Sequence, residues 1–125
     1  MPVSTHSHTA VLADWLRKRH ASIKDCEVKA WKALHEDKDE KAYRALMAER
    51  TDRIASLDEE SAELTAVLPE DKREPIETAL RRFARGARNA QRLESVFYMS
   101  ALLYPDEHRE GEPDNLERLL QELEE

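Results

Sequence analysis

Apolar residues recur at alternating intervals of three and four along most of this chain, which has 125 residues. Such intervals place side chains on one face of an α-helix, whereas a strand needs apolar residues at every second position. The longest run follows a 4-3-4-3-4-3-4 spacing through Tyr43, Met47, Arg50, Ile54, Leu57, Ser61, Leu64 and Leu68. The spacing predicts an all-α protein in which each helix buries one face.

The composition favours helices and argues against β-folds. Only 2 residues are glycine and 38% are charged, compared with about 25% charged residues in an ordinary globular domain. Sandwiches and barrels need many turn glycines and strand-forming runs, which this chain lacks. No apolar segment reaches the roughly 18 residues that a membrane span requires, so we expect no membrane association.

Prolines, capping residues and changes of apolar phase delimit four helical segments. They cover about residues 9–35, 39–67, 75–104 and 113–124. The first two have no Gly or Pro between them, but the apolar phase resets there, and Asp37 followed by Glu40 has the spacing of a capping box. The third begins near Pro75 and stops at Pro105, because proline is tolerated in a first helical turn and disrupts a helix further along.

The arrangement of these segments predicts a single domain, residues 9–125, after a disordered lead over residues 1–8. Three long helices of similar length with short connections are typical of an antiparallel up-down-up bundle. The short last helix is amphipathic, and its apolar face consists of Leu116, Leu119, Leu120 and Leu123. We therefore expect an antiparallel bundle of three long helices plus a short C-terminal helix.

Charge and cysteine usage restrict the classes of partner and compartment. The 27 acidic and 20 basic residues give a net charge of −7, whereas binding to duplex nucleic acid depends on a basic surface. We therefore expect no nucleic-acid partner. The single cysteine, Cys26, excludes an internal disulfide, and residues 1–9 lack the apolar stretch of a secretory signal. Both features favour the cytoplasm.

Histidine and cysteine form no recognisable site in the sequence. His6 and His8 have the spacing of a chelate but lie in the lead, and the other three histidines fit no common ligand spacing. Cys26 lies on an apolar helix face, where a free thiol is typical of a core. The sequence therefore predicts no catalytic residue, no metal ligand and no cofactor.

Paired carboxylates are the one feature that suggests an enzyme. Three pairs are separated by one helical turn: Glu36 and Asp39, Glu49 and Asp52, Glu60 and Glu63. Each pair offers oxygen ligands to Mg²⁺. The pairs resemble the Glu-x-x-Glu and Glu-x-x-Asp strings of the all-α nucleotide pyrophosphatases, and the resemblance covers only these short strings. It implies, as an alternative function, a small Mg²⁺-dependent hydrolase of nucleotide-like substrates.

Four arginines form a stripe on the predicted third helix. Arg81, Arg85, Arg88 and Arg92 follow the spacing i, i+4, i+7, i+11, which places their guanidinium groups on one line. Two interpretations stay open. The stripe is either a solvated face balanced by acidic residues of the 39–67 helix, or a surface that docks an acidic partner or a nucleic-acid backbone.

The stripe becomes apolar as it continues through Val96, Met99 and Leu103. Because Phe97, Ala101 and Tyr104 are expected on the core face, the 96–104 segment is apolar on nearly all sides and must be covered. Its cover is either the face of Leu116 and Leu120 or another molecule. We interpret these residues, together with the arginine stripe, as a candidate partner-binding surface.

No catalytic constellation emerges from these patterns. The sequence favours a small non-enzymatic helical adaptor in the cytoplasm that binds a partner protein and self-associates. The Mg²⁺-dependent hydrolase remains the alternative.

Overall fold

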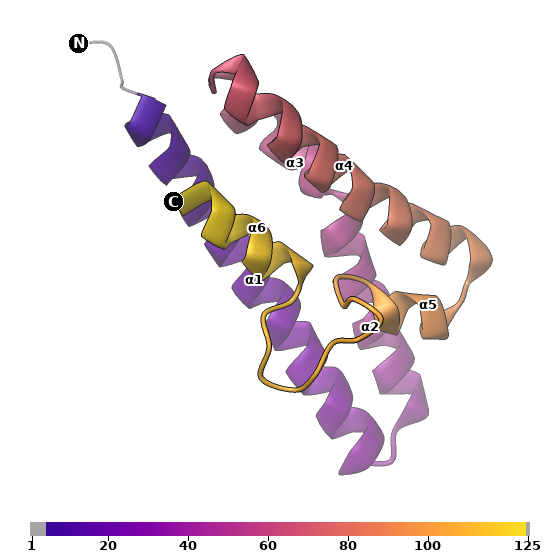
Figure 1. Ribbon diagram of the computed structural model, residues 1–125. Coiled ribbons are helices and arrows are strands. Elements are labelled where there is room, and N and C mark those ends of the chain that lie inside the picture. The colour runs from indigo at the N-terminus through magenta and orange to yellow at the C-terminus, as the bar shows by residue number, and fades with distance from the viewer. Residues whose placement is uncertain (1–4, 125) are drawn as a thin grey trace.

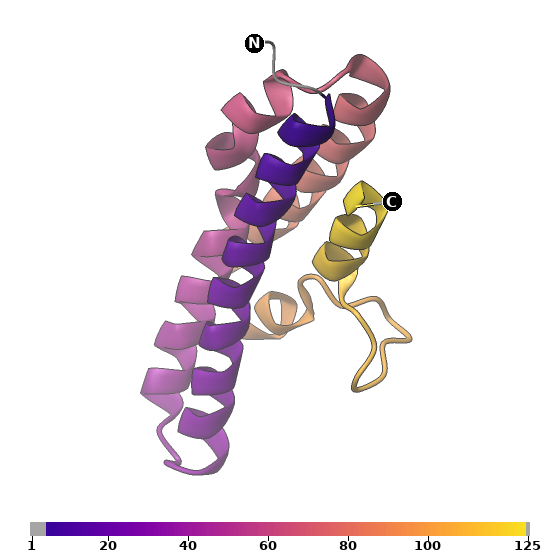
Figure 2. The same cartoon turned by 90° about the vertical axis from the view of Figure 1, so that its left-hand side faces the viewer.

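The structure, a computed structural model, describes residues 5–124 and contains six helices and no strand within that range. The helices are α1 (Thr5–His35), α2 (Glu40–Ala55), α3 (Leu57–Ala66), α4 (Glu70–Leu93), α5 (Val96–Ala101) and α6 (Asn115–Glu124). They form an all-α bundle in which α1, the α2–α3 pair and α4 alternate in direction (Figure 1). In Figure 2, α6 lies on one side of α1 and α2 lies on the other. The predicted fold class is confirmed.

The predicted turn between the first two helices is confirmed, with a different cap. Asp39 rather than Asp37 is the N-cap of α2, and its side chain accepts a hydrogen bond of 3.0 Å from the Ala42 N–H. Lys38, with φ 55°, adopts the left-handed conformation that reverses the chain. This turn lets α2 pack antiparallel against α1.

Helix α1 begins earlier than predicted. It starts at Thr5, four residues before the expected start at about residue 9, so it includes residues 5–8 of the lead. Residues 1–4 of that lead lie outside the described residues. The segment 5–9 contains no Gly or Pro that would stop a helix from extending towards the N-terminus.

The predicted 39–67 helix is divided at Ser56, which lies between α2 and α3. Ser56 has φ −96° and ψ 1°, and its hydroxyl donates a hydrogen bond of 3.2 Å to the Arg53 carbonyl. Serine competes with the helical ladder in this way because its short side chain reaches nearby backbone groups. Ile54 and Leu57, on either side of the break, are nevertheless both fully buried.

The predicted 75–104 helix is wrong at both ends. Helix α4 begins at Glu70, directly after Pro69, and Pro75 lies inside it. Glu70 and Asp71 place negative charge in the first turn, where it interacts favourably with the helix dipole. The missing N–H of Pro75 removes one ladder bond close to the helix start, and the rest of α4 continues past it.

The other end of that segment breaks at Glu94, which separates α4 from α5. Glu94 takes φ 52°, the left-handed C-cap conformation, and the Ser95 N–H donates to the Ala90 carbonyl at 3.2 Å. The Ser95 side chain then accepts a hydrogen bond of 3.2 Å from the Tyr98 N–H and starts α5. Glycine is the usual residue at such a position, so the sequence gives no clear signal of this turn.

Replacing Glu94 with glycine is expected to stabilise the protein. Glycine adopts a positive φ without steric strain, so Glu94→Gly should raise the free energy of unfolding by about 0.5–1 kcal/mol in urea denaturation. Glu63→Gly, at an exposed site within α3, is the control and should destabilise the protein by a similar amount. A Glu94→Gly variant less stable than wild type would contradict the left-handed cap.

The core extends through the whole bundle. Its larger cluster brings Leu16 of α1, Leu57 of α3 and Leu80 of α4 together with the leucines of α6. A smaller cluster lies near the α1–α2 turn and consists of Ala30, Met47, Ala90 and Met99, with partly buried neighbours. The apolar helix faces predicted from spacing therefore meet in two clusters, and the partly buried Leu102 packs against both.

Leu57 tests the placement of this interior. Because it is fully buried, Leu57→Ala should lower the free energy of unfolding by about 2–5 kcal/mol through lost burial and a cavity. Val67→Ala, at a half-exposed position beside α3, should have little effect. Thermal or urea unfolding measures both, and equal midpoints for the two variants would contradict the observed packing.

Candidate functional site

The structure buries most of the predicted apolar partner surface inside the chain itself. Leu103 belongs to the same buried cluster as Leu116 and Leu120 of α6, while Met99 packs in the smaller cluster between α1, α2 and α4. Val96 is half-buried beside Met99. The sequence left open whether the chain itself or another molecule covers these residues. In the structure, helices of the same chain cover them.

A different set of apolar residues is exposed around the α4–α5 turn. Phe97 is 75% exposed, Leu93 57% and Tyr98 54%. The Phe97 and Tyr98 rings meet edge-on with centroids 5.6 Å apart. The sequence placed Phe97 on the core face, and this was wrong because the turn at Glu94 starts a new helix and resets the phase.

The arginine stripe is divided between structural and solvent-exposed roles. Arg88 donates to the Ala55 carbonyl at 2.9 Å and to Asp58 at 2.7 Å. It thereby satisfies a carbonyl left free by the Ser56 break. Arg81 lies 3.9 Å from Glu77, Arg92 donates to Asn89 at 2.6 Å, and Arg85 is exposed. Of the four arginines of the stripe, only Arg88 is therefore paired with acidic residues of the 39–67 segment.

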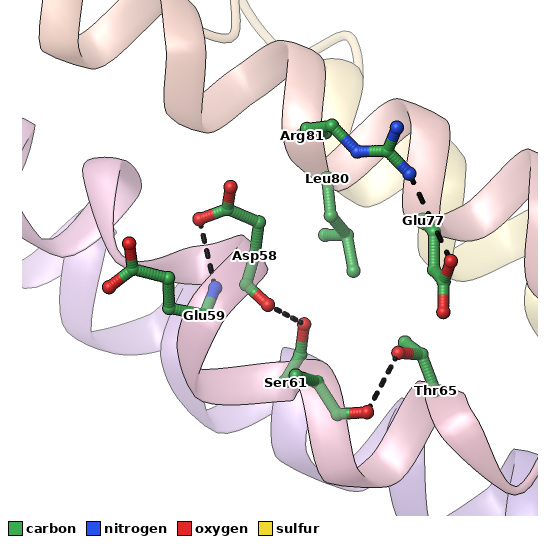
Figure 3. Close-up of a pocket in the computed structure, with 8 residues that line it drawn as sticks. Asp58, Glu59, Ser61, Thr65, Glu77, Leu80 and Arg81 are labelled. Carbon is green, nitrogen blue, oxygen red and sulfur yellow. Dashed lines mark hydrogen bonds and ion pairs between the residues drawn. The ribbon is translucent and has the colours of Figure 1, made fainter.

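A shallow groove of about 330 Å³ separates α3 from α4 beside Arg81. Figure 3 shows Arg81 directed along α4 towards Glu77, with Asp58 and Glu59 on the opposite wall. The hydroxyls of Ser61 and Thr65 donate to backbone carbonyls of their own helix at 3.3 and 3.1 Å. Neither hydroxyl is paired with a general base, so the groove offers no activated nucleophile.

Four of the six predicted carboxylates take part in a helix cap, an ion pair or a hydrogen bond within the protein. Asp39 caps α2, Glu49 pairs with Arg53, Glu60 pairs with Arg19, and Asp52 accepts a hydrogen bond of 3.3 Å from Gln91. Within residues 5–124, no pair joins a group of three side chains able to hold a metal ion. The hydrolase alternative thus gains no support from the geometry of these residues.

A buried guanidinium group organises the centre of the molecule. Arg50 has no solvent exposure, and it donates to the Met99 and Leu102 carbonyls, both at 2.8 Å, and to Glu27 Oε1 at 2.9 Å. The Tyr104 hydroxyl donates to the other Glu27 oxygen at 2.7 Å. Burial, and then this hydrogen bond, raise the pKa of the Tyr104 phenol above its ordinary value. The network fixes the end of α5 onto α1 and α2.

Removing this guanidinium group is expected to destabilise the protein strongly. Arg50→Ala leaves a half-buried carboxylate and two carbonyls without their donor, so the free energy of unfolding should fall by about 3–5 kcal/mol in urea denaturation. Arg44→Ala, which removes an exposed ion pair with Glu40 on the same helix, should leave the midpoint nearly unchanged. Equal midpoints for the two variants would show that Arg50 does not hold α5 in place.

A second polar cluster joins α1 to the start of α6. Asp114 is 1% exposed; its Oδ1 accepts the Glu117 N–H at 2.8 Å, and its own N–H donates to Glu117 Oε1 at 3.1 Å. This is a capping box at the start of α6. His20 Nε2, on α1, lies 2.9 Å from Asp114 Oδ2 and 3.6 Å from Glu117 Oε1.

The cluster is electrostatically self-consistent. The hydrogen bond to Asp114 raises the pKa of His20, although burial opposes that shift. Burial would raise the pKa of Asp114, but hydrogen bonds from His20 and from the Glu117 N–H outweigh it, so this pKa is lowered. No sequence pattern indicates the cluster, because 94 residues separate His20 from Asp114. The only local signal was the capping-box spacing of Asp114 and Glu117 before the leucine helix.

Comparisons with known proteins do not assign a family. No family model, no curated protein and no solved structure matches the chain. None of the helices in the described range combines the length and apolar character needed to cross a lipid bilayer.

Proposed function

We propose that this protein is a small non-enzymatic helical adaptor that binds a partner protein through the α4–α5 turn. The observation that carries the proposal is the exposure of Leu93, Phe97 and Tyr98 on adjoining helices, which we call the aromatic surface. Aromatic side chains are enriched at protein interfaces and dominate binding energies there. The cytoplasm is the proposed compartment, in keeping with a lone, buried Cys26.

The aromatic surface is supported by a fixed backbone. Ser95 caps the start of α5, and Arg50 binds the Met99 and Leu102 carbonyls at its end. A six-residue helix has little stability of its own, so these contacts hold the rings in place before a partner arrives. Such preorganisation reduces the entropy lost on binding.

The charge next to the aromatic surface indicates the chemistry of the partner. Arg85 and Arg92 are exposed on α4, on the helix that leads to Leu93, while the whole chain carries a net charge of −7. A local basic line beside exposed rings complements a segment that combines acidic and apolar side chains. We also propose that the protein self-associates through the same surface, because a second copy of this acidic chain carries negative charge that complements the arginines.

Substituting the two rings tests this function. Phe97→Ser with Tyr98→Ser should weaken partner binding and self-association at least tenfold, because both exposed rings are lost, while the melting temperature stays close to wild type. Sedimentation of the purified protein measures self-association. Quantitative co-purification from cells of the native source measures partner binding, which should also weaken with added salt.

The matched control is Trp31→Ser with Val28→Ser, which removes two exposed apolar side chains from α1. It should leave all associations unchanged. If the α5 variant keeps its associations, or if the α1 variant loses them, the aromatic surface is not the binding site.

A further inference from the structure

We infer that His20, Asp114 and Glu117 form a binding site for one divalent transition-metal cation of the Zn²⁺ type, independent of the proposed adaptor function. The ligand atoms of the three side chains all lie within 4.8 Å of one another. His20 Nε2 is 2.9 Å from Asp114 Oδ2 and 3.6 Å from Glu117 Oε1. Tetrahedral Zn²⁺ with bonds near 2.0–2.1 Å spaces its ligand atoms by about 3.3 Å, which falls between these two distances.

The carboxylates are held in position by backbone contacts that a metal leaves intact. Asp114 Oδ1 accepts the Glu117 N–H, so Oδ2 is the oxygen turned towards His20. Glu117 Oε1, the oxygen 3.6 Å from His20 Nε2, accepts the Asp114 N–H with one lone pair and keeps its other lone pair for a cation. Because Asp114 is almost fully buried, a cation bound there is shielded from most of the solvent. The site therefore requires small side-chain adjustments and no change of fold.

A solvent-filled hollow borders the cluster and gives the cation a route of entry. The hollow, of about 710 Å³, is lined by Glu117 and also by Lys24, Tyr104, His108, Glu110 and Glu112. Three protein ligands leave a fourth tetrahedral position for water or a small molecule. Among the charged residues of this lining, Glu110, Glu112 and Glu117 outnumber Lys24, and the excess of negative charge favours the approach of cations.

The donor set selects the class of cation. One imidazole nitrogen with two carboxylates suits Zn²⁺ and related transition metals, whereas Mg²⁺ prefers oxygen ligands and keeps several waters. Binding also connects α1 to α6, segments 94 residues apart in the chain. A cation that binds only the folded protein therefore stabilises it in proportion to its affinity and concentration.

The test is Zn²⁺ titration of the full chain after removal of metal with EDTA. His6 and His8 are replaced by glutamine in every sample, so that their chelate-like spacing does not contribute. We expect one Zn²⁺ per chain by calorimetry, a melting temperature that rises with Zn²⁺ concentration, and no competition from equimolar Mg²⁺.

Glu117→Gln is the informative variant, because glutamine also serves at this position of a capping box and preserves the start of α6. It should weaken Zn²⁺ binding at least tenfold with unchanged helical content, and His20→Gln should do the same. His35→Gln, at an exposed histidine of α1, should bind Zn²⁺ as the parent protein does. Absence of binding at micromolar Zn²⁺, full competition by Mg²⁺, or wild-type affinity in Glu117→Gln would each overturn the site.

Discussion

The hydrogen bonds of the Arg50 guanidinium group connect α1, α2 and the end of α5 at one buried point. The last carbonyls of any helix have no partner within that helix, and in α5 they lie against the protein interior. Arg50 supplies the missing donors, and Glu27 balances its charge. Arg88 has the same relation to the Ala55 carbonyl at the end of α2. The end of α2 and the end of α5 are thus each closed by an arginine from a neighbouring helix.

Spacing predicted the helical faces well because burial depends directly on it. Met47, Ile54, Leu57 and Leu68 lie where their intervals placed them, and even Arg50, a polar residue on an apolar face, is buried there. The breaks were harder to predict. Neither Ser56 nor Glu94 is a Gly or Pro. At the first break Arg88 of α4 binds the Ala55 carbonyl, and at the second Glu94 is left-handed and the Ser95 N–H donates to the Ala90 carbonyl. Pro75 led to the opposite error: a helix start was predicted there, but α4 begins at Glu70 and continues past Pro75.

A missed helix break also changes which residues are predicted to be exposed. A single helix from 75 to 104 would direct Phe97 inward and Met99 towards a partner. The turn at Glu94 reverses both assignments, so Phe97 is exposed and Met99 is buried. His20 illustrates a different limit. Its neighbours come from the other end of the chain, and no spacing rule within one segment brings residues 20 and 114 together.

The position of α6 also affects the order in which the chain folds. Helix α6 packs chiefly against α1, from which the other four described helices separate it along the chain, whereas α2 follows α1 after a turn of only four residues. Contacts between neighbouring segments form early because little loop entropy is lost, and contacts across the whole chain form late. On the ribosome, the apolar face of α1 around Leu12 and Leu16 therefore stays partly uncovered until residues 115–124 emerge. During that interval the nascent chain presents a hydrophobic surface that the finished protein conceals.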